Sequence, residues 1–391
     1  MLVFIIIFWI CLFLIIHSYI IFPLILSVLS RNKKINEINF NNKSDDLPTI
    51  SILLAVYNEA NVIEEKIHST FKTNYPLNKI EFLIGSDAST DATNKLIENL
   101  RLRFPSIKLS LFAGRTGKSG IINQLADIAN GEILLLTDAN VFFNEETIFQ
   151  LVKHFKNQKI GQVGANIINT IHKKEGISFQ EKSYLKRENL IKFQEGLIWG
   201  CMIGAFGGCY AIRKKLFVKV PPNFLMDDFF ISMNVLAEKF HAINELNAQC
   251  FEDVSNKIKE EFRRKVRISA GNFQNLNYYQ HLLFKPFSGI AFCFFSHKVI
   301  RWITPFLLII LLFSTVYLSF YSNFYQITLL FFLISIFIPL IDSLLKTIHI
   351  HIRIIRFISH FYLMNLALMI GFFQYKKGVN TNVWKPTQRN Q

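Results

Sequence analysis

The chain has 391 residues, of which 51% are hydrophobic, 14% aromatic and only 18% charged, yet 43 Lys and Arg against 28 Asp and Glu leave a formal net charge of +15. Soluble proteins average about a quarter charged residues, so the composition excludes a disordered chain and argues against an ordinary soluble enzyme. The five cysteines are odd in number and show no CxxC spacing, which excludes a disulfide scaffold and favours a reducing compartment.

The N-terminal segment predicts a transmembrane helix over residues 1–30. Residues 2–29 carry no formal charge, and about 20 apolar residues are enough to span a bilayer. No basic segment precedes the run and no small-residue cleavage site follows it, so a signal peptide is the weaker interpretation. Basic residues open the linker 31–48, which places that end in the cytoplasm. We therefore expect an integral protein of the cell (inner) membrane with a cytoplasmic globular domain.

Residues 49–283 predict that globular domain, because strand patterns alternate with helical ones. Four apolar runs predict strands, and amphipathic segments between them predict helices; the strands are expected at 49–56, 79–87, 107–112 and 132–138. This alternation predicts an α/β fold with a doubly wound, mostly parallel sheet. In such sheets ligands bind beyond the carboxyl ends of the strands.

Carboxylates follow three of these strands. Glu59 comes just after the first strand, Asp87 ends the second and Asp138 ends the fourth. One Asp after a strand is usually a helix cap, but three at the same edge of a sheet favour a binding site.

The chain becomes apolar again after the globular domain. Aromatic residues at 284–300 predict an interfacial helix, and the segment 301–375 predicts about three transmembrane helices, at 303–320, 324–344 and 357–373. Three C-terminal spans would leave the tail 376–391 outside, although this tail is basic. Either the third span is re-entrant or the segment 286–299 also crosses the membrane.

The basic residues do not indicate a nucleic-acid partner. They are scattered or lie beside membrane segments, and no nucleic-acid-binding motif is present. An anionic lipid surface and a phosphate-bearing substrate account for the positive charge more simply.

A glycine-rich turn precedes Lys118. The spacing does not fit a Walker A motif, because Phe112 occupies the position that requires glycine. A lysine at a helix start still suits a phosphate group, and a solvated lysine is an equally good interpretation.

Five motifs in this order resemble family 2 glycosyltransferases, in particular the membrane-bound, polysaccharide-synthase-like branch. They are SILLAVYNEANVIEEKI, GSDASTDAT, GRTGKSGIINQ, LLLTDAN and MDDFFISM, and the resemblance covers about residues 49–280. It implies a GT-A fold and sugar transfer from a nucleotide-sugar donor, usually with inversion and with a divalent metal, Mg²⁺ or Mn²⁺.

The resemblance also implies roles for individual residues. Asp228 would be the catalytic base, beside Asp227, and Asp138 with Asn140 would form the metal-binding motif. Tyr57 and Glu59 would face the nucleotide base and ribose, and Asp87 would hydrogen-bond the base. Lys118 and the region of Arg264 and Arg267 would lie near the diphosphate.

Three departures from the family pattern bear on the chemistry. Ser86 replaces the first Asp of a common pair, Asn140 replaces the second acidic residue of the metal motif, and the QxxRW motif of processive synthases lacks its Trp around Arg267. A neutral Asn carbonyl binds a hard cation more weakly than a carboxylate does, so the metal would depend more on the diphosphate.

The predicted function is transfer of a sugar from a nucleotide-diphosphate donor, UDP-linked, to a hydroxyl of a saccharide or lipid-linked acceptor, with membrane lipids as further partners. The alternative is an inactive GT-A domain that scaffolds an envelope polysaccharide assembly, suggested by Ser86 and Asn140. A transporter has thin support, since Asp342 is the lone acidic residue within the predicted spans.

Overall fold

The computed structural model describes residues 1–35, 38–41, 46–170, 178–253, 258–285, 288–348, 350 and 352–383. The chain divides into two compact units. A catalytic unit comprises 26–257, 284–291 and 379–391, and a membrane unit comprises 1–25, 258–283 and 292–378. Each is described by itself.

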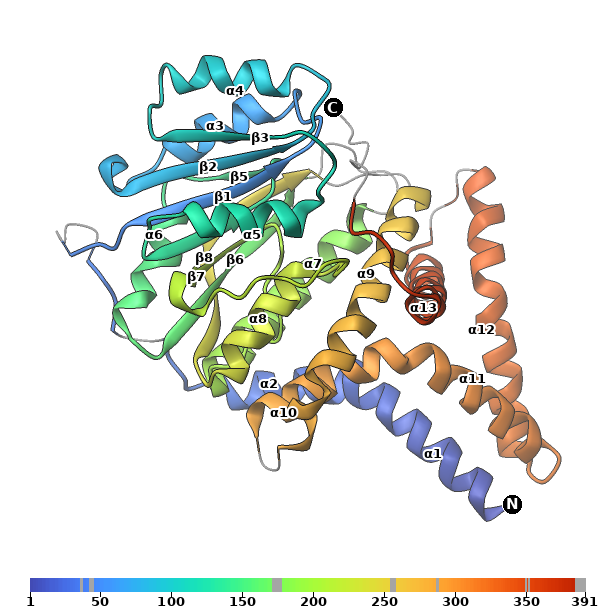
Figure 1. Ribbon diagram of the computed structural model, residues 1–391. Helices are drawn as coiled ribbons and strands as arrows, with labels where there is room; N and C mark the ends of the chain where they lie inside the picture. The colour runs from blue at the N-terminus through green and yellow to red at the C-terminus, as the bar shows by residue number, and fades with distance from the viewer. Residues whose placement is uncertain are drawn as a thin grey trace. The chain divides into compact units, whose positions relative to one another are not determined.

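The catalytic unit is built on one eight-stranded sheet in the order β3-β2-β1-β4-β7-β6-β8-β5 (Figure 1). The strands pair in parallel across β3, β2, β1 and β4, whereas β7 is antiparallel to both its neighbours and β5 is antiparallel to β8. Their bounds are β1 Ile50–Val56, β2 Ile80–Asp87, β3 Ile107–Phe112, β4 Ile133–Thr137, β5 Val141–Phe143, β6 Ile160–Thr170, β7 Cys209–Arg213 and β8 His241–Asp253. The doubly wound, mostly parallel sheet predicted from the sequence is confirmed.

Helices cover both faces of the sheet (Figure 1). They are α3 Ile63–Phe71, α4 Thr93–Arg101, α5 Lys118–Ile128, α6 Thr147–Val152, α7 Ser178–Trp199 and α8 Asp227–Ala237. Helices α3, α4 and α6 share one apolar core with the sheet, in which Ile52 and Leu54 of β1 are fully buried. Helix α5 packs on β2, where Ile121 approaches the backbone of Gly85 so closely that a Cβ there would lie 2.3 Å from its side chain. Strands β2 and β3 are added on one side of β1, whereas β4 is added on its other side. The order of the strands therefore reverses between β1 and β4. A crevice forms beyond the carboxyl ends of strands at such a point.

The membrane unit is helical. Its elements are α1 Leu2–Ile16, a π-helical turn His17–Ile21, α9 Ile258–Tyr279, a π-helical turn Phe294–Val299, α11 Ile300–Ser319, α12 Asn323–Thr347 and α13 Arg353–Lys377. Helix α2 Phe22–Leu29 continues α1, and α10 Gly289–Cys293 continues into α11. Hence residues within the segment expected to form a separate interfacial helix, 284–300, belong to one helix from Gly289 to Ser319.

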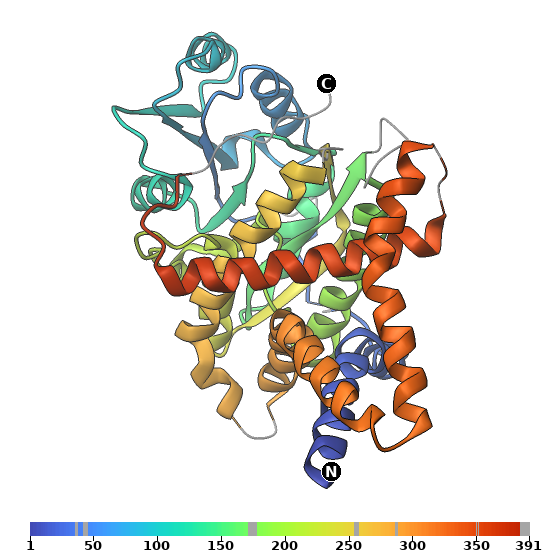
Figure 2. The same cartoon turned by 90° about the vertical axis from the view of Figure 1, so that its right-hand side faces the viewer.

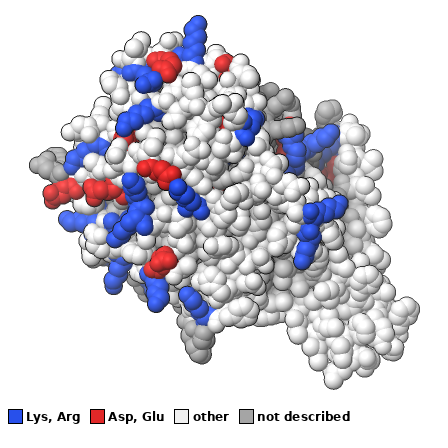
Figure 3. All heavy atoms as spheres, viewed as in Figure 1, with Lys and Arg blue, Asp and Glu red and all other residues white. Residues whose placement is uncertain are grey.

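Four helices of the described residues are long and apolar enough to cross a membrane: Leu2–Leu29, Gly289–Ser319, Asn323–Thr347 and Arg353–Lys377. The first two pack together through a buried cluster that includes Phe8, Cys11 and Leu307. Where α1, α11 and α12 face the viewer in Figure 3, almost no charged side chain reaches the surface. One N-terminal and three C-terminal apolar helices match the number predicted.

Candidate active site

The carboxyl end of β4 carries the centre of the site. Asp138 follows β4 directly, and its backbone N–H donates to the carbonyl of Gly208 at 3.2 Å, which ties the end of β4 to the segment that enters β7. The Asp138 side chain is 36% exposed, so one of its oxygens faces the solvent side of the sheet edge while the other accepts a hydrogen bond from Lys118.

Lys118 pairs with two carboxylates that come from distant parts of the chain. Its Nζ lies 2.6 Å from Asp138 Oδ1 and 4.0 Å from Asp227 Oδ2. Burial disfavours the charged amine, but Asp138, then Asp227 and Asp228, raise the pKa of Lys118 above its ordinary value. The residue is therefore a fixed cation at the first turn of α5, where the free N–H groups of the helix also favour an anion.

Asp228 is the buried member of this cluster. It is the second residue of α8 and 7% exposed, and its Oδ1 accepts a hydrogen bond from the N–H of Phe229 at 2.8 Å. Burial, and after it the charge of Asp227, raise the pKa of Asp228 to about 6, and Lys118 opposes this rise. A carboxyl group with a pKa near 6 can hold or release a proton close to neutral pH, which is what a general base requires.

Gly207 leaves the space that Asp228 occupies. A Cβ at Gly207 would lie 2.8 Å from Asp228 Oδ2, so any side chain there would displace the carboxylate. Lys192 of α7 adds a positive charge that lowers the pKa of Asp228, and its Nζ lies 3.5 Å from the centre of the Phe206 ring.

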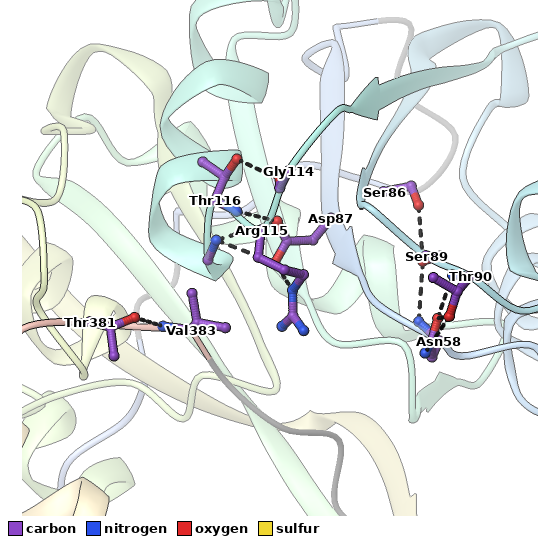
Figure 4. Close-up of polar contacts among 11 residues, drawn as sticks. Asn58, Ser86, Asp87, Ser89, Thr90, Gly114, Arg115, Thr116, Thr381 and Val383 are labelled. Carbon is purple, nitrogen blue, oxygen red and sulfur yellow. Dashed lines mark hydrogen bonds and ion pairs between the residues drawn. The ribbon is translucent and has the colours of Figure 1, made fainter.

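Asp87 shapes the turn that presents Lys118. Its side chain is fully buried at the end of β2, and its oxygens accept hydrogen bonds from Arg115 Nε at 2.9 Å, from Thr116 N at 2.5 Å and from Gly117 N at 3.2 Å (Figure 4). Gly117 has φ +83°, a conformation that favours glycine. Asp87 was predicted to hydrogen-bond the nucleotide base; here its carboxylate organises the turn between β3 and α5.

Arg115 was not among the predicted site residues. Its guanidinium lies 3.3 Å from the centre of the Tyr57 ring and pairs with Asp87, so it forms a flat stack at the edge where β1 and β2 end. Glu59, predicted to face the ribose, lies in the same region, and its backbone N–H donates to Thr93 Oγ1 at 2.9 Å. The Asn58 side chain accepts from Thr90 N at 2.8 Å, which joins the loops after β1 and β2 (Figure 4).

The amide group of Asn140 makes a contact on β8. Its Nδ2 donates to Glu252 Oε1 at 3.0 Å and the residue is 6% exposed. Among the described residues, no group of three or more His, Cys, Asp or Glu side chains forms a metal cage. Asp138 thus offers one carboxylate to a divalent cation, and this donor set fits a cation bound mainly through phosphate oxygens.

Lys66 supports the loop that carries Asp138 and Asn140. Its side chain is completely buried, and its Nζ donates to Thr137 Oγ1 at 2.8 Å and to the carbonyl of Val141 at 2.5 Å. Burial lowers the pKa of Lys66 to about 8. The amphipathic helix pattern around Lys66 in the sequence does not predict this contact.

Arg264 and Arg267, predicted near the diphosphate, lie on α9 in the membrane unit. Arg264 Nη1 lies 3.5 Å from Glu261 Oε2 on the same helix. The structure thus brings Asp138, Asp227, Asp228 and Lys118 into one cluster within the catalytic unit, whereas the two arginines are described with the other unit.

A known family model matches part of the chain. Residues 51–220 match the family model described as glycosyl transferase family 2. This match confirms, over residues 51–220, the resemblance to family 2 glycosyltransferases that the motifs predicted.

Particular relatives agree with this class. The chain is 31% identical over 119 residues to the beta-monoglucosyldiacylglycerol synthase of Nostoc sp. (strain PCC 7120), covering 30% of this chain and 25% of that protein. It is 25% identical over 234 residues to the poly-beta-1,6-N-acetyl-D-glucosamine synthase of Staphylococcus epidermidis, covering 58% of this chain and 55% of that one. The chain thus spans between a quarter and just over half of the length of these curated relatives.

The fold is shared with a solved structure, the mannosyltransferase PcManGT from Pyrobaculum calidifontis in complex with GDP-Man and Mn²⁺. The TM-score is 0.71 at 18% sequence identity, over 95% of this chain and 99% of that chain. This similarity confirms the GT-A type architecture with its apolar helices.

Proposed function

We propose that this protein is a membrane-bound, inverting glycosyltransferase. It transfers a sugar from a nucleotide-diphosphate donor, UDP-linked, to a hydroxyl group of a saccharide or lipid-linked acceptor. The observation that carries the proposal is the cluster of Lys118 with Asp138, Asp227 and Asp228 at the carboxyl edge of the sheet. The four apolar helices and the names of the relatives support an acceptor at the membrane, with the catalytic unit on the cytoplasmic face of the inner membrane.

The donor's diphosphate carries the charge that this site must hold. Lys118 Nζ and the N–H groups of the first turn of α5 bind its oxygens. The turn held by Asp87 and the stack of Arg115 on Tyr57 bind and orient the nucleoside. Asp138, with Asn140 beside it, would hold Mg²⁺ or Mn²⁺ together with the diphosphate. The cation would supply Lewis-acid stabilisation of the departing phosphate.

Asp228 acts as the general base. Its carboxylate accepts the proton of the acceptor hydroxyl while that oxygen forms a bond to the anomeric carbon. The bond from this carbon to the diphosphate oxygen breaks on the opposite face, and its electron pair leaves with the nucleoside diphosphate. Attack from the face opposite the leaving group inverts the configuration.

Burial of Asp228 has a specific consequence for this step. A carboxylate that has lost part of its hydration is a stronger base than one in water, and a pKa near 6 leaves it mostly ionised at pH 7. Asp227 keeps this pKa raised, and Lys118 limits the effect.

Release of nucleotide tests the proposal. Purified protein is incubated with UDP-glucose, UDP-N-acetylglucosamine or GDP-mannose, with Mn²⁺ or Mg²⁺ and with lipid and saccharide acceptors. We expect metal-dependent release from a UDP-linked donor. Release from GDP-mannose alone would replace the UDP assignment, and no release from any donor would favour the inactive scaffold that Asn140 and Ser86 suggest.

A further inference from the structure

A pocket in the catalytic unit lies away from the candidate active site. It has a volume of about 350 Å³ and is lined by the end of α7, by the starts of β6 and β8 and by linker residues 34 and 35. Strands β6 and β8 pair in parallel from Ile160 and His241 onward, so both begin at the same edge of the sheet (Figure 2). All of these lining residues belong to the catalytic unit.

The register of the sheet separates this pocket from Asp138. Leu136 of β4 pairs with Tyr210 of β7, and Tyr210 pairs with Gly164 of β6. Strand β7 is antiparallel to both neighbours, so β4 and β6 run in the same direction. Asp138 follows Leu136 by two residues and Ile160 precedes Gly164 by four. Six residues of strand at about 3.3 Å each put the pocket about 20 Å from the level of Asp138.

The lining combines an apolar wall with positive charge. The wall consists of half-buried side chains of α7, namely Phe193, Leu197, Ile198 and Trp199. Lys34 and His241 are the ionisable residues among the described residues that line the pocket, and none of these is acidic. Lys33 Nζ donates to the carbonyl of Ile198 at 3.1 Å, which adds a second cation beside the wall. Such a lining suits a ligand that has both an anionic group and an apolar part.

Two glycines bring α7 against the start of β8 and so shape the pocket. A Cβ at Gly196 would lie 2.9 Å from the Cα of Ile243. Gly200 has φ +65°, and a Cβ there would lie 2.6 Å from Cγ of His241. A side chain at either position would push α7 away from β8. The close packing therefore fixes the His241 ring beside the wall that α7 forms.

The chain enters this pocket directly from an apolar helix. The helix Leu2–Leu29 is long and apolar enough to cross a membrane, and its last residues, 26–29, belong to the catalytic unit. Ser30 Oγ accepts a hydrogen bond from Gln194 Nε2 at 3.1 Å, so the end of this helix is held on α7. Lys34 follows Leu29 by five residues, which reach at most about 17 Å. This distance places Lys34 near the level of the lipid headgroups.

A second apolar helix starts at the same wall. Gly289 is the first residue of the helix Gly289–Ser319 and belongs to the catalytic unit. A Cβ at Gly289 would lie 2.6 Å from Cγ of Trp199. Trp side chains are enriched at the boundary between membrane and water, and the cytoplasmic leaflet carries anionic lipids. The pocket therefore lies where an anionic lipid headgroup is available.

We propose that this pocket binds the headgroup of an anionic membrane phospholipid. The phosphate is held by Lys34 and His241, and the glycerol and first methylene groups contact Leu197 and Trp199. A bound lipid ties the linker at Lys34 to the wall of α7 and anchors the catalytic unit to the anionic leaflet. This proposal rests on the proposed function only in the attachment to a membrane, because the site uses neither the donor nor the acceptor.

Titration of the full chain in a neutral detergent tests the ligand class. The probes are dihexanoylphosphatidylglycerol, dihexanoylphosphatidylcholine and inorganic phosphate. We expect the first to bind at least about tenfold more tightly than the other two, because phosphatidylcholine carries its own cation and inorganic phosphate has no apolar part. Equal binding of the two lipids would overturn the anionic headgroup. Equal binding of inorganic phosphate would identify a free anion and overturn the lipid.

Variants of the charged rim locate the site. Lys34→Gln should raise the Kd for dihexanoylphosphatidylglycerol by about five- to tenfold. Lys95→Gln is the matched control, because it removes the same charge from an exposed residue of α4, which contacts β3 at the other end of the strand order from β8. Lys95→Gln should leave this Kd unchanged. Equal Kd values for the two variants would overturn the assignment of the pocket.

A charge placed in the apolar wall gives a second test. Leu197→Glu brings a carboxylate to a half-buried position and should weaken binding of dihexanoylphosphatidylglycerol by more than about tenfold, whereas Leu197→Gln, of nearly the same shape, should weaken it much less. Both variants are first shown to unfold at the same temperature. Equal weakening by Glu and Gln would contradict an anionic ligand at this wall.

Nucleotide binding separates failure of this proposal from failure of the proposed function. Leu197→Glu should bind UDP with Mn²⁺ as the wild-type protein does, because the pocket lies about 20 Å from Asp138 along the strands. An unchanged Kd for dihexanoylphosphatidylglycerol in Leu197→Glu would overturn the lipid site alone. Lipid binding that is lost in Leu197→Glu, in a protein that binds no nucleotide, would support the lipid site and contradict the transferase function alone.

Discussion

Replacing Asp228 by Asn should abolish turnover and at the same time stabilise the protein. A pKa near 6 in the folded protein, against an ordinary value of 3.8, corresponds to about 3 kcal/mol at 1.36 kcal/mol per pKa unit. This is the free energy by which burial and Asp227 disfavour the ionised carboxylate. Asn carries no charge and keeps an oxygen that can accept the hydrogen bond from Phe229 N, so the variant avoids this cost.

The stabilisation by Asp228→Asn should depend on pH. Because the folded-state pKa of Asp228 lies above the unfolded value, the folded protein holds the proton more tightly, and wild-type stability falls as the pH rises from about 4 to about 6. The stabilisation of Asp228→Asn should thus be absent below pH 4 and reach at most about 3 kcal/mol above pH 6.

Thermal unfolding in detergent at pH 4 and pH 7.5 measures the difference in stability between Asp228→Asn and the wild-type protein. For a domain of this size, 1 kcal/mol shifts Tm by about 2–4 °C, so about 3 kcal/mol corresponds to a rise of at most about 6–12 °C at pH 7.5, with no rise at pH 4. Asp127→Asn is the matched control, since Asp127 is 53% exposed and its pair with Lys219 lies at the surface; it should change stability little at either pH. A lower Tm for Asp228→Asn at pH 7.5, or full activity, would refute the account of Asp228 as a buried base.

Three further predictions concern the same cluster. The value of kcat/KM should rise with pH along a single ionisation near 6, because the base Asp228 must lose its proton; a flat profile between pH 5 and 8 would contradict this. Lys118→Met removes the cation that lowers the pKa of Asp228, so the ionisation seen in kcat/KM should move to higher pH and the donor KM should rise by about ten- to a hundredfold; an unshifted pH profile would argue against their coupling. Lys66→Met frees the loop between Thr137 and Val141 and should raise the Mn²⁺ concentration for half-maximal activity by about tenfold, whereas unchanged metal dependence would show that this loop is held by other contacts.

The first half of the sheet could be predicted closely from the sequence. Strands expected at 49–56, 79–87, 107–112 and 132–138 are observed as Ile50–Val56, Ile80–Asp87, Ile107–Phe112 and Ile133–Thr137. Three of them, β1, β2 and β4, lie inside the sheet and are mostly apolar, so their composition marks them. The edge strand β3, IKLSLF, instead alternates apolar with polar residues.

The second half of the sheet could not be predicted in the same way. Strand β6, Ile160–Thr170, contains Gln162, Asn166 and Asn169, and its pairing with β8 contains two register shifts. Two of these side chains bond distant residues: Gln162 Nε2 donates to Ser232 Oγ at 2.9 Å, and Asn166 Nδ2 donates to the carbonyl of Leu246 at 2.9 Å. Such partners are not visible in a local pattern.

The site likewise contains residues that the sequence predicts and contacts that it does not. Asp138 follows a predicted strand of the parallel part of the sheet, where ligand sites are expected, and Asp228 lies at the start of a predicted helix. The contacts of Lys66 and Arg115 depend on side-chain packing, which the spacing of residues along the chain does not predict.

The central claim is tested most directly by release of nucleoside diphosphate from UDP-linked and GDP-linked sugars by purified wild-type protein and by Asp228→Asn. The account predicts release from one UDP-linked donor that requires Mn²⁺ or Mg²⁺ and is lost in the variant. Release that is equal in both proteins would contradict the assignment of Asp228 as the base, and no release from any donor with acceptors present would contradict the function itself.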